Sequence, residues 1–142
     1  MSDQSFKTHA RYIPMWHLIT PLLMAALLGG SIVNFVQADE HTHYSAALIL
    51  LISILMLILY WYARAFALRA QDRAIRAEEN FRHFLLTGKP LDSKLRMSQI
   101  IGLRFASDAE FPALAQRAVA ENLSIKQIKM EIKNWKADHN RV

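Results

Sequence analysis

The residues best suited to metal chemistry stand in one short loop, which reads ADEHTH at residues 38–43. His41 and His43 offer imidazole nitrogens, and Asp39 and Glu40 offer carboxylate oxygens, which are common ligands of divalent metals. So short a loop leaves the coordination sphere incomplete, and the sequence identifies no further ligand for it. We therefore expect no resident metal.

The remaining reactive side chains form no recognisable catalytic constellation. Haem between two helices would require facing histidines at depth, but His17 stands at the start of one apolar run and the second run has none. Arg104, Asp108 and Glu110 surround a predicted helix junction, where capping explains them. There is no P-loop, dinucleotide-binding motif or nucleophile elbow, and the absence of cysteine excludes disulfides and thiolate catalysis. We expect a non-enzymatic protein without a cofactor.

A basic stripe is predicted near the end of the chain. Its members are Lys126, Lys129, Lys133 and Lys136, beside an apolar face of the same helix. Three short helices with a basic third one fit the helix-turn-helix plan, and the net charge of +5 suits a nucleic-acid ligand. Lysine stripes are more often solvated, and an anionic membrane surface is the nearer partner for this chain. Nucleic-acid binding is therefore kept as the alternative, with lipid headgroups favoured.

Two uncharged apolar runs meet the length of about 20 residues that a helix needs to cross a bilayer. The first is HLITPLLMAALLGGSIVNFVQ at 17–37, and the second is YSAALILLISILMLILYWYA at 44–63. A secretory signal peptide is the alternative for the first run, but a long polar or mixed segment precedes it and no A-x-A-like cleavage site follows. We expect both runs to span a membrane as an antiparallel hairpin.

The charges around these runs predict their orientation. Lys7 and Arg11 precede the first run and five arginines follow the second within 64–82, whereas the connecting loop 38–45 contains no Lys or Arg. The positive-inside rule therefore places both termini in the cytoplasm and the loop outside. Trp16 and the aromatic cluster 60–62 are expected at the cytoplasmic boundary of the membrane.

The first run carries two further signals. Pro21 is expected to kink the helix near its cytoplasmic end, because proline cannot donate a backbone hydrogen bond. Ala25 with Gly29 and Ala26 with Gly30 form small-xxx-small pairs, which permit close approach of another helix. We expect the second run to be that helix.

Beyond the second run, small and aromatic residues recur at alternating spacings of four and three, the heptad pattern of a helix that packs along another helix. They are Ala63, Ala67, Ala70, Ala74, Ala77, Phe81 and Phe84. We interpret the segment as a cytoplasmic stalk. The alternative is an amphipathic helix lying on lipid headgroups, with its arginines on phosphates. The residues expected to contact headgroups or an anionic partner are Arg64, Arg69, Arg73 and Arg76.

The stalk is predicted to continue the second run as one helix from Ala46 to about Leu86. Pairs at a spacing of four, Asp72 with Arg76 and Glu78 with Arg82, would support it in water. The sequence TGKP at 87–90 would end it, because glycine suits a left-handed cap and proline cannot continue the helix.

Three short capped helices are predicted after residue 90. Ser98 is expected to cap the first, a Ser107–Glu110 capping box to open a second helix that ends near Asn122, and a Ser124–Gln127 box to open a third that ends near Asp138. Their apolar residues would form a small core: Ile100, Ile101, Leu103, Phe105, Phe111, Leu114, Val119, Leu123, Ile125, Ile128, Ile132 and Trp135.

The expected fold is thus all-α, with an antiparallel transmembrane hairpin whose second helix extends into the cytoplasm and leads to a small three-helix module. The expected divisions are 1–16 (cytoplasmic segment), 17–37 (first span), 38–45 (external loop), 46–63 (second span), 64–88 (stalk) and 89–142 (module).

The segments 5–14, 63–79, 103–123 and 125–142 resemble an uncharacterised family of small bacterial two-span membrane proteins, a domain of unknown function. The resemblance covers essentially the whole chain. It implies a bacterial inner-membrane location and carries no activity or ligand. We expect a protein that acts through protein–protein contacts, as an accessory subunit, assembly factor or tether. Its expected partners are membrane lipids and another membrane protein or a second copy of itself.

Overall fold

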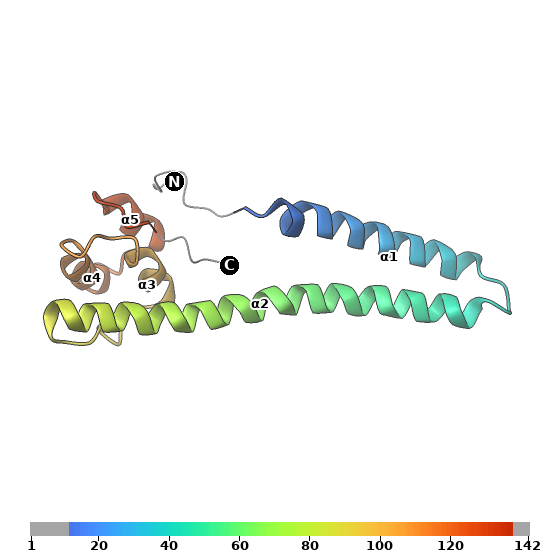
Figure 1. The fold of residues 1–142 in the computed structure, drawn as a ribbon, viewed down its shortest axis with the longest axis horizontal. Helices are drawn as coiled ribbons and strands as arrows, with labels where there is room; N and C mark the ends of the chain where they lie inside the picture. The colour runs from blue at the N-terminus through green and yellow to red at the C-terminus, as the bar shows by residue number, and fades with distance from the viewer. Residues whose placement is uncertain (1–11, 138–142) are drawn as a thin grey trace. The chain divides into compact units, whose positions relative to one another are not determined.

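A computed structural model describes residues 12–137, and the regular elements of these residues are all helices, with no β-strand (Figure 1). The elements are a π-helical turn η1 (Met15–Ile19) and the α-helices α1 (Thr20–Gln37), α2 (His43–Thr87), α3 (Met97–Leu103), α4 (Phe111–Ala120) and α5 (Ile125–Glu131). The all-α class and the two long apolar helices are confirmed. The chain divides into two compact units, with the division after Ala67 inside α2.

The start of α1 departs from α-helical geometry where Pro21 was expected to disturb it. The preceding turn η1 is π-helical, and both the backbone N–H and the hydroxyl of Thr20 donate to the carbonyl of Met15. A proline ring clashes with the carbonyl one turn earlier and offers no N–H to it. The wider π turn relieves that conflict before regular α geometry begins.

Within the first unit, α1 contacts the apolar half of α2 in reverse order along the chain. The hydroxyls of Ser31 and Ser53 lie 3.0 Å apart, and both serines are buried. Nearer the start of α1, the ring of Trp16 stacks on Tyr60 at 4.4 Å, and the Tyr60 hydroxyl donates to the Trp16 carbonyl. These two helical segments therefore pack antiparallel.

The small-xxx-small pairs do not make this contact. A Cβ atom added at Gly29 or at Gly30 would meet nothing within 4 Å apart from its own helix and chain neighbours. The prediction that the second apolar run fills this face is therefore wrong. The contact runs through Ser31 and Ser53 instead. Their buried hydroxyls also donate to the carbonyls of Leu28 and Leu50 in their own helices, so both are satisfied where the helices meet.

The helix α2 is continuous for 45 residues, so the prediction of one helix from Ala46 to about Leu86 is confirmed with slightly wider limits. It ends at Thr87, and the next residue is Gly88, as expected, whose φ of 70° is left-handed and whose N–H donates to the carbonyl of Phe84. Glycine adopts this conformation without the steric cost that a side chain imposes.

The second unit has one hydrophobic core, formed by α3, α4, α5 and the end of α2. Its buried members are Ile75, Leu95, Ile100, Leu103, Phe105, Ala106, Phe111, Leu114, Ala115, Ala118, Leu123, Ile128 and Ile132. Most of the predicted core is confirmed, but Ile75 comes from α2. The module is therefore not confined to residues 89–142, because it uses the stalk as one of its walls.

Two of the three predicted caps differ in the structure. Met97 begins α3 one residue before Ser98, and the side chain of Gln99 accepts from the N–H of Arg96. The N-cap of α4 is Glu110 rather than Ser107, no side chain caps this helix, and the Glu110 carboxylate accepts from the Asn134 amide. The Ser124–Gln127 box is confirmed, with the serine hydroxyl accepting from the N–H of Gln127.

Both of the last two helices end earlier than expected. The left-handed backbone of Asn122 (φ 52°) follows the end of α4 at Ala120. Helix α5 ends at Glu131 because the chain beyond it is extended, with the N–H of Lys136 donating to the carbonyl of Phe105. Trp135 pairs with Ala106 in an isolated bridge and lies against the Phe105 ring at 5.1 Å. Burial of that indole competes successfully with helix continuation.

Candidate functional site

The stalk residues with heptad spacing form an exposed face, which we call the alanine–phenylalanine face. Its members in the second unit are Ala70, Ala74, Ala77, Phe81 and Phe84, and all are exposed. The Phe81 side chain is 63% exposed and that of Phe84 is 50% exposed. Leu85 extends the patch and is 67% exposed. Adjacent apolar side chains this exposed, outside the apolar spans, are typical of an interaction surface. The other two predicted seam residues, Ala63 and Ala67, lie in the first unit.

The module uses a different side of α2. Ile75, Glu79 and His83 recur at a spacing of four and are all buried. With about 3.6 residues per turn, this row lies on the side of the helix roughly opposite to the alanine–phenylalanine face. The sequence pattern missed the row because two of its three members are polar and give no apolar period. The module therefore leaves the alanine–phenylalanine face exposed, with the segment 91–95 beside it at Ala77.

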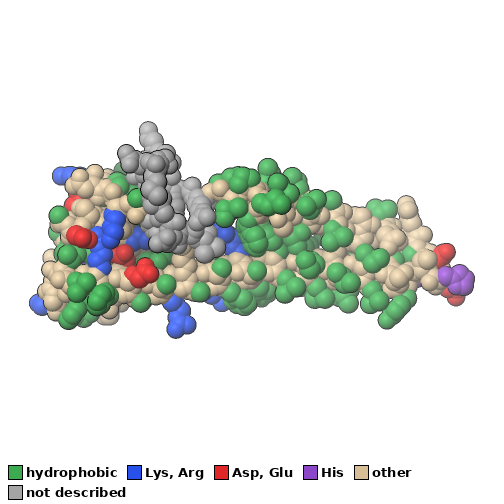
Figure 2. All heavy atoms as spheres, in the orientation of Figure 1, with side chains coloured by type: hydrophobic (Ala, Val, Ile, Leu, Met, Phe, Trp, Pro, Cys, Tyr) green, Lys and Arg blue, Asp and Glu red, His purple; other side chains and the backbone are tan. Residues whose placement is uncertain are grey.

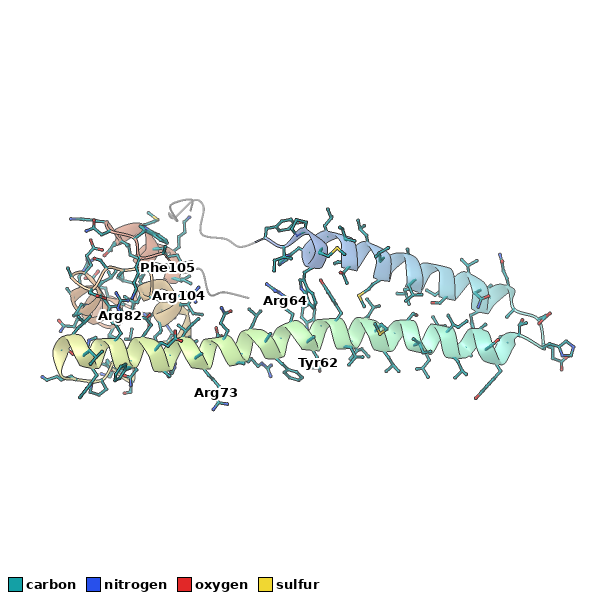
Figure 3. The ribbon with its side chains drawn as sticks, viewed as in Figure 1. Tyr62, Arg64, Arg73, Arg82, Arg104 and Phe105 are labelled. Atoms are coloured by element: carbon teal, nitrogen blue, oxygen red, sulfur yellow. The ribbon has the colours of Figure 1, made fainter. Side chains whose placement is uncertain are left out.

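Arg82 connects α2 to the chain that precedes α4 (Figure 3). Its guanidinium pairs with Glu79 at 2.9 Å and with Asp108 at 2.6 Å, and it donates to the Ala106 carbonyl. The group also lies 4.5 Å above the centre of the Phe111 ring. The predicted pairing of Arg82 with Glu78 is wrong, since these contacts orient Arg82 toward the module.

The same contact perturbs one carboxyl group. The hydrogen bond from Arg82, followed by the charge of Arg82, lowers the pKa of Asp108 below its ordinary value. The Asp108 side chain is 63% exposed, so solvent screens the interaction. The contact fastens the second unit together, and nothing about it resembles a proton-transfer pair.

His83 has a structural environment as well. Its Nδ1 atom lies 2.8 Å from the carbonyl of Lys89 and 3.2 Å from the hydroxyl of Thr87. The ring packs edge-on against Phe111. These contacts hold the turn after α2 against the module.

The predicted lysine stripe is not continuous. Only Lys126 and Lys129 lie in α5, whereas Lys133 and Lys136 follow its end at Glu131. The Lys129 ammonium lies 5.0 Å above the Phe105 ring, so it covers the core. Four lysines on one helical face, the basis of the nucleic-acid hypothesis, are therefore not present.

The arginines expected to meet an anionic partner have different environments. Arg69, Arg73 and Arg76 are exposed, and Arg64 is half-buried. Arg73 and Arg82 project from α2 on opposite sides (Figure 3), so Arg73 does not share the contacts that Arg82 makes with the chain before α4. Arg73 and Arg76 line a pocket of about 430 Å³ beside Ala77. The other wall of this pocket is formed by Leu91, Asp92, Ser93, Leu95 and Ile100, so the carboxylate of Asp92 shares the pocket with the two arginines.

The histidine loop has a local structural role. Asp39 accepts from both the N–H and the hydroxyl of Thr42, which closes the turn before α2. These hydrogen bonds lower the pKa of Asp39. His43 lies against Phe35 with a ring separation of 4.6 Å. Across the described residues 12–137, no three potential metal ligands among His, Asp and Glu gather at one point.

Hydrophobic side chains cover much of α1 and the first half of α2, whereas Lys, Arg, Asp and Glu side chains gather over α3–α5 and the end of α2 (Figure 2). Both α2 and the η1–α1 segment (Met15–Gln37) are long and apolar enough to cross a membrane. Comparisons with curated proteins and with solved structures found no match. A family model matches the chain over residues 1–142, and the protein therefore belongs to the family of unknown function DUF6526.

Proposed function

We propose that this protein is a non-enzymatic integral protein of the bacterial inner membrane that acts through protein–protein contacts, as an accessory subunit, assembly factor or tether. The observation that carries the proposal is the two-sided end of α2. One side holds the module through Ile75, Glu79 and His83, and the other exposes the alanine–phenylalanine face to a partner.

The apolar helices support membrane insertion. In each candidate span only about a tenth of the apolar window is buried by the rest of the chain, although Leu22, Leu23 and Leu59 are large apolar residues. A core helix of a water-soluble domain would bury such side chains against its own fold. Hydrocarbon is the environment in which so many exposed aliphatic side chains are stable.

The charge distribution supports the orientation. The loop 38–42 carries Asp39 and Glu40 and no Lys or Arg, whereas exposed arginines follow the second apolar run. The positive-inside rule puts that loop outside the cell and the module in the cytoplasm. The alanine–phenylalanine face would then be presented to cytoplasmic segments of neighbouring proteins.

The experiment is affinity purification of the full chain from gently solubilised membranes. We expect specific co-purifying protein to be lost when Phe81 and Phe84 are both changed to Ser, because that substitution removes the apolar contact area of the face. The matched control is Met130→Ser, which changes an apolar side chain of α5 that is 64% exposed. Co-purification that is the same for the double variant and the control, or a native chain that elutes with neither a differently tagged second copy nor another protein, would refute the proposal.

A further inference from the structure

We propose that the occupant of the alanine–phenylalanine face is a second copy of this chain, in a parallel helix pair that sets Arg73 of one copy beside Glu78 of the other. This inference rests on the proposed function, because it names the partner of the same face. It also uses the proposed membrane orientation, since two copies in one bilayer point the same way.

The heptad register gives the geometry of such a pair. Ala74 and Phe81 occupy the position called a, and Ala70, Ala77 and Phe84 occupy the position called d. All five are exposed, and the module packs on roughly the opposite side of α2. The face is therefore open to a facing helix, and the segment 91–93 of the same chain lies beside its Arg73 flank. Alanine at three of the five positions permits close approach of the two backbones.

The flanks of the face supply the charge complementarity. Arg73 precedes an a position and Glu78 follows a d position, so the two lie on opposite flanks of one helix. In a parallel pair, a residue that directly precedes an a position contacts the residue five positions further on in the facing helix, which directly follows a d position. Arg73 therefore meets Glu78 of the other copy, and two-fold symmetry creates this contact twice. In the described part of the chain, neither side chain has an ion-pair partner of its own.

The neighbouring flank contacts are compatible with the same arrangement. By the same rule Asn80, whose side-chain oxygen accepts from the N–H of Leu91 in its own chain, would lie on the side of Leu85 of the other copy, which brings no like charges together. An antiparallel pair would set each flank against itself and separate Arg73 from Glu78. The residues thus favour a parallel second copy over a foreign helix, because every copy carries the complement of its own flanks.

The test is disulfide crosslinking of the full chain in its own membranes. The natural sequence has no cysteine, so a single Ala74→Cys or Ala77→Cys variant has no background. Facing Cβ atoms in a close pair approach disulfide distance, and we expect oxidation to give a product of twice the chain mass. The matched control is Ala113→Cys, the same substitution at an exposed position of α4. A dimer yield no greater than that of the control would overturn the proposal.

A charge exchange then identifies the partner. In the Ala74→Cys background, Arg73→Glu and Glu78→Arg should each lower the dimer yield, by about three- to tenfold for two exposed contacts turned repulsive. The variant with both substitutions should restore the yield if the partner is a second copy. Each copy then carries both changes, and the pair of opposite charges forms again with its sides exchanged. Absence of rescue would overturn the second-copy assignment.

The failures of the two proposals differ. If a photo-crosslinker at Arg73 captures one defined foreign membrane protein and no second copy, the homodimer is refuted while the protein–protein function stands. If it captures neither, and the native chain also purifies alone, both proposals fail.

Discussion

Gln99→Leu is the most informative perturbation of the module, because Gln99 is a buried polar side chain that joins three parts of the second unit. Its amide NH₂ donates to the Ala118 carbonyl at 2.8 Å and to the Leu123 carbonyl at 3.0 Å. Its amide oxygen accepts from the N–H of Arg96 at the start of α3. Leucine has a similar volume and makes none of these bonds.

The magnitude follows from what each partner loses. The Ala118 carbonyl still accepts from the N–H of Leu123, and the Leu123 carbonyl keeps a long contact with Arg96. Neither acceptor is orphaned completely, and the N–H of Arg96 belongs to an exposed residue that water can reach, so each lost bond costs about 1 kcal/mol rather than a full burial penalty. Three bonds give about 3 kcal/mol, from which burial of the apolar leucine recovers about 1 kcal/mol. We expect a net loss of about 2 kcal/mol in local stability.

The assay is amide hydrogen exchange of the full chain in detergent micelles, followed over residues 97–123. For amides that exchange only when the module opens, a loss of about 2 kcal/mol corresponds to hydrogen exchange that is roughly 30-fold faster. The control is Gln116→Leu, the same substitution at an exposed position of α4, which should leave exchange unchanged. Exchange in Gln99→Leu that matched the control would refute the claim that these three hydrogen bonds hold the module together.

Three further predictions concern α2. Arg82→Ala removes contacts to Glu79, Asp108 and the chain before α4, and it leaves the Glu79 carboxylate buried without its partner. Amide hydrogen exchange over 104–111 should therefore become faster by an amount equivalent to about 3 kcal/mol. Unchanged exchange would contradict the role assigned to Arg82. Because the pKa of Asp108 is lowered, its contribution to folding stability is complete above the ordinary pKa of 3.8 and is lost as the pH falls through the folded-state pKa. Pepsin cleavage within 104–111 should therefore increase on acidification in the native chain, and this part of the pH dependence should be absent in Asp108→Asn. Ala70→Leu with Ala74→Leu should reduce disulfide capture at Ala77→Cys, because added volume holds the facing backbones apart; undiminished capture would mean that the alanines do not form the contact.

Much of the fold follows from local patterns in the chain. The limits of α2 were predictable because an apolar run and a heptad pattern adjoin without a breaker and Gly88 terminates them. The start of α5 was predictable because the Ser124–Gln127 cap forms within one turn. Its end was not, since the extended segment around Trp135 is stabilised by Phe105 and Ala106, which are distant in sequence.

The candidate site divides in the same way. Its alanine–phenylalanine face was visible as a heptad, since the spacing of small and aromatic residues on one helix depends only on helical geometry. The side of α2 that holds the module was not visible, because Glu79 and His83 are polar and are buried only by partners that approach from α3–α5. The partner of Arg82 was not visible either, because Glu78 and Glu79 both lie within one turn of it on α2.

The sequence by itself determined the helical class, the two apolar runs, the continuity of α2 and the face that α2 offers, because each depends on spacing within one segment. The tertiary structure alone decided which acid pairs with Arg82, which serines join α1 to α2, where α4 and α5 end, and that Ile75 completes the module core. Those outcomes depend on which groups bury one another. Burial and hydrogen bonding between distant segments outweigh local preferences of about 1 kcal/mol or less.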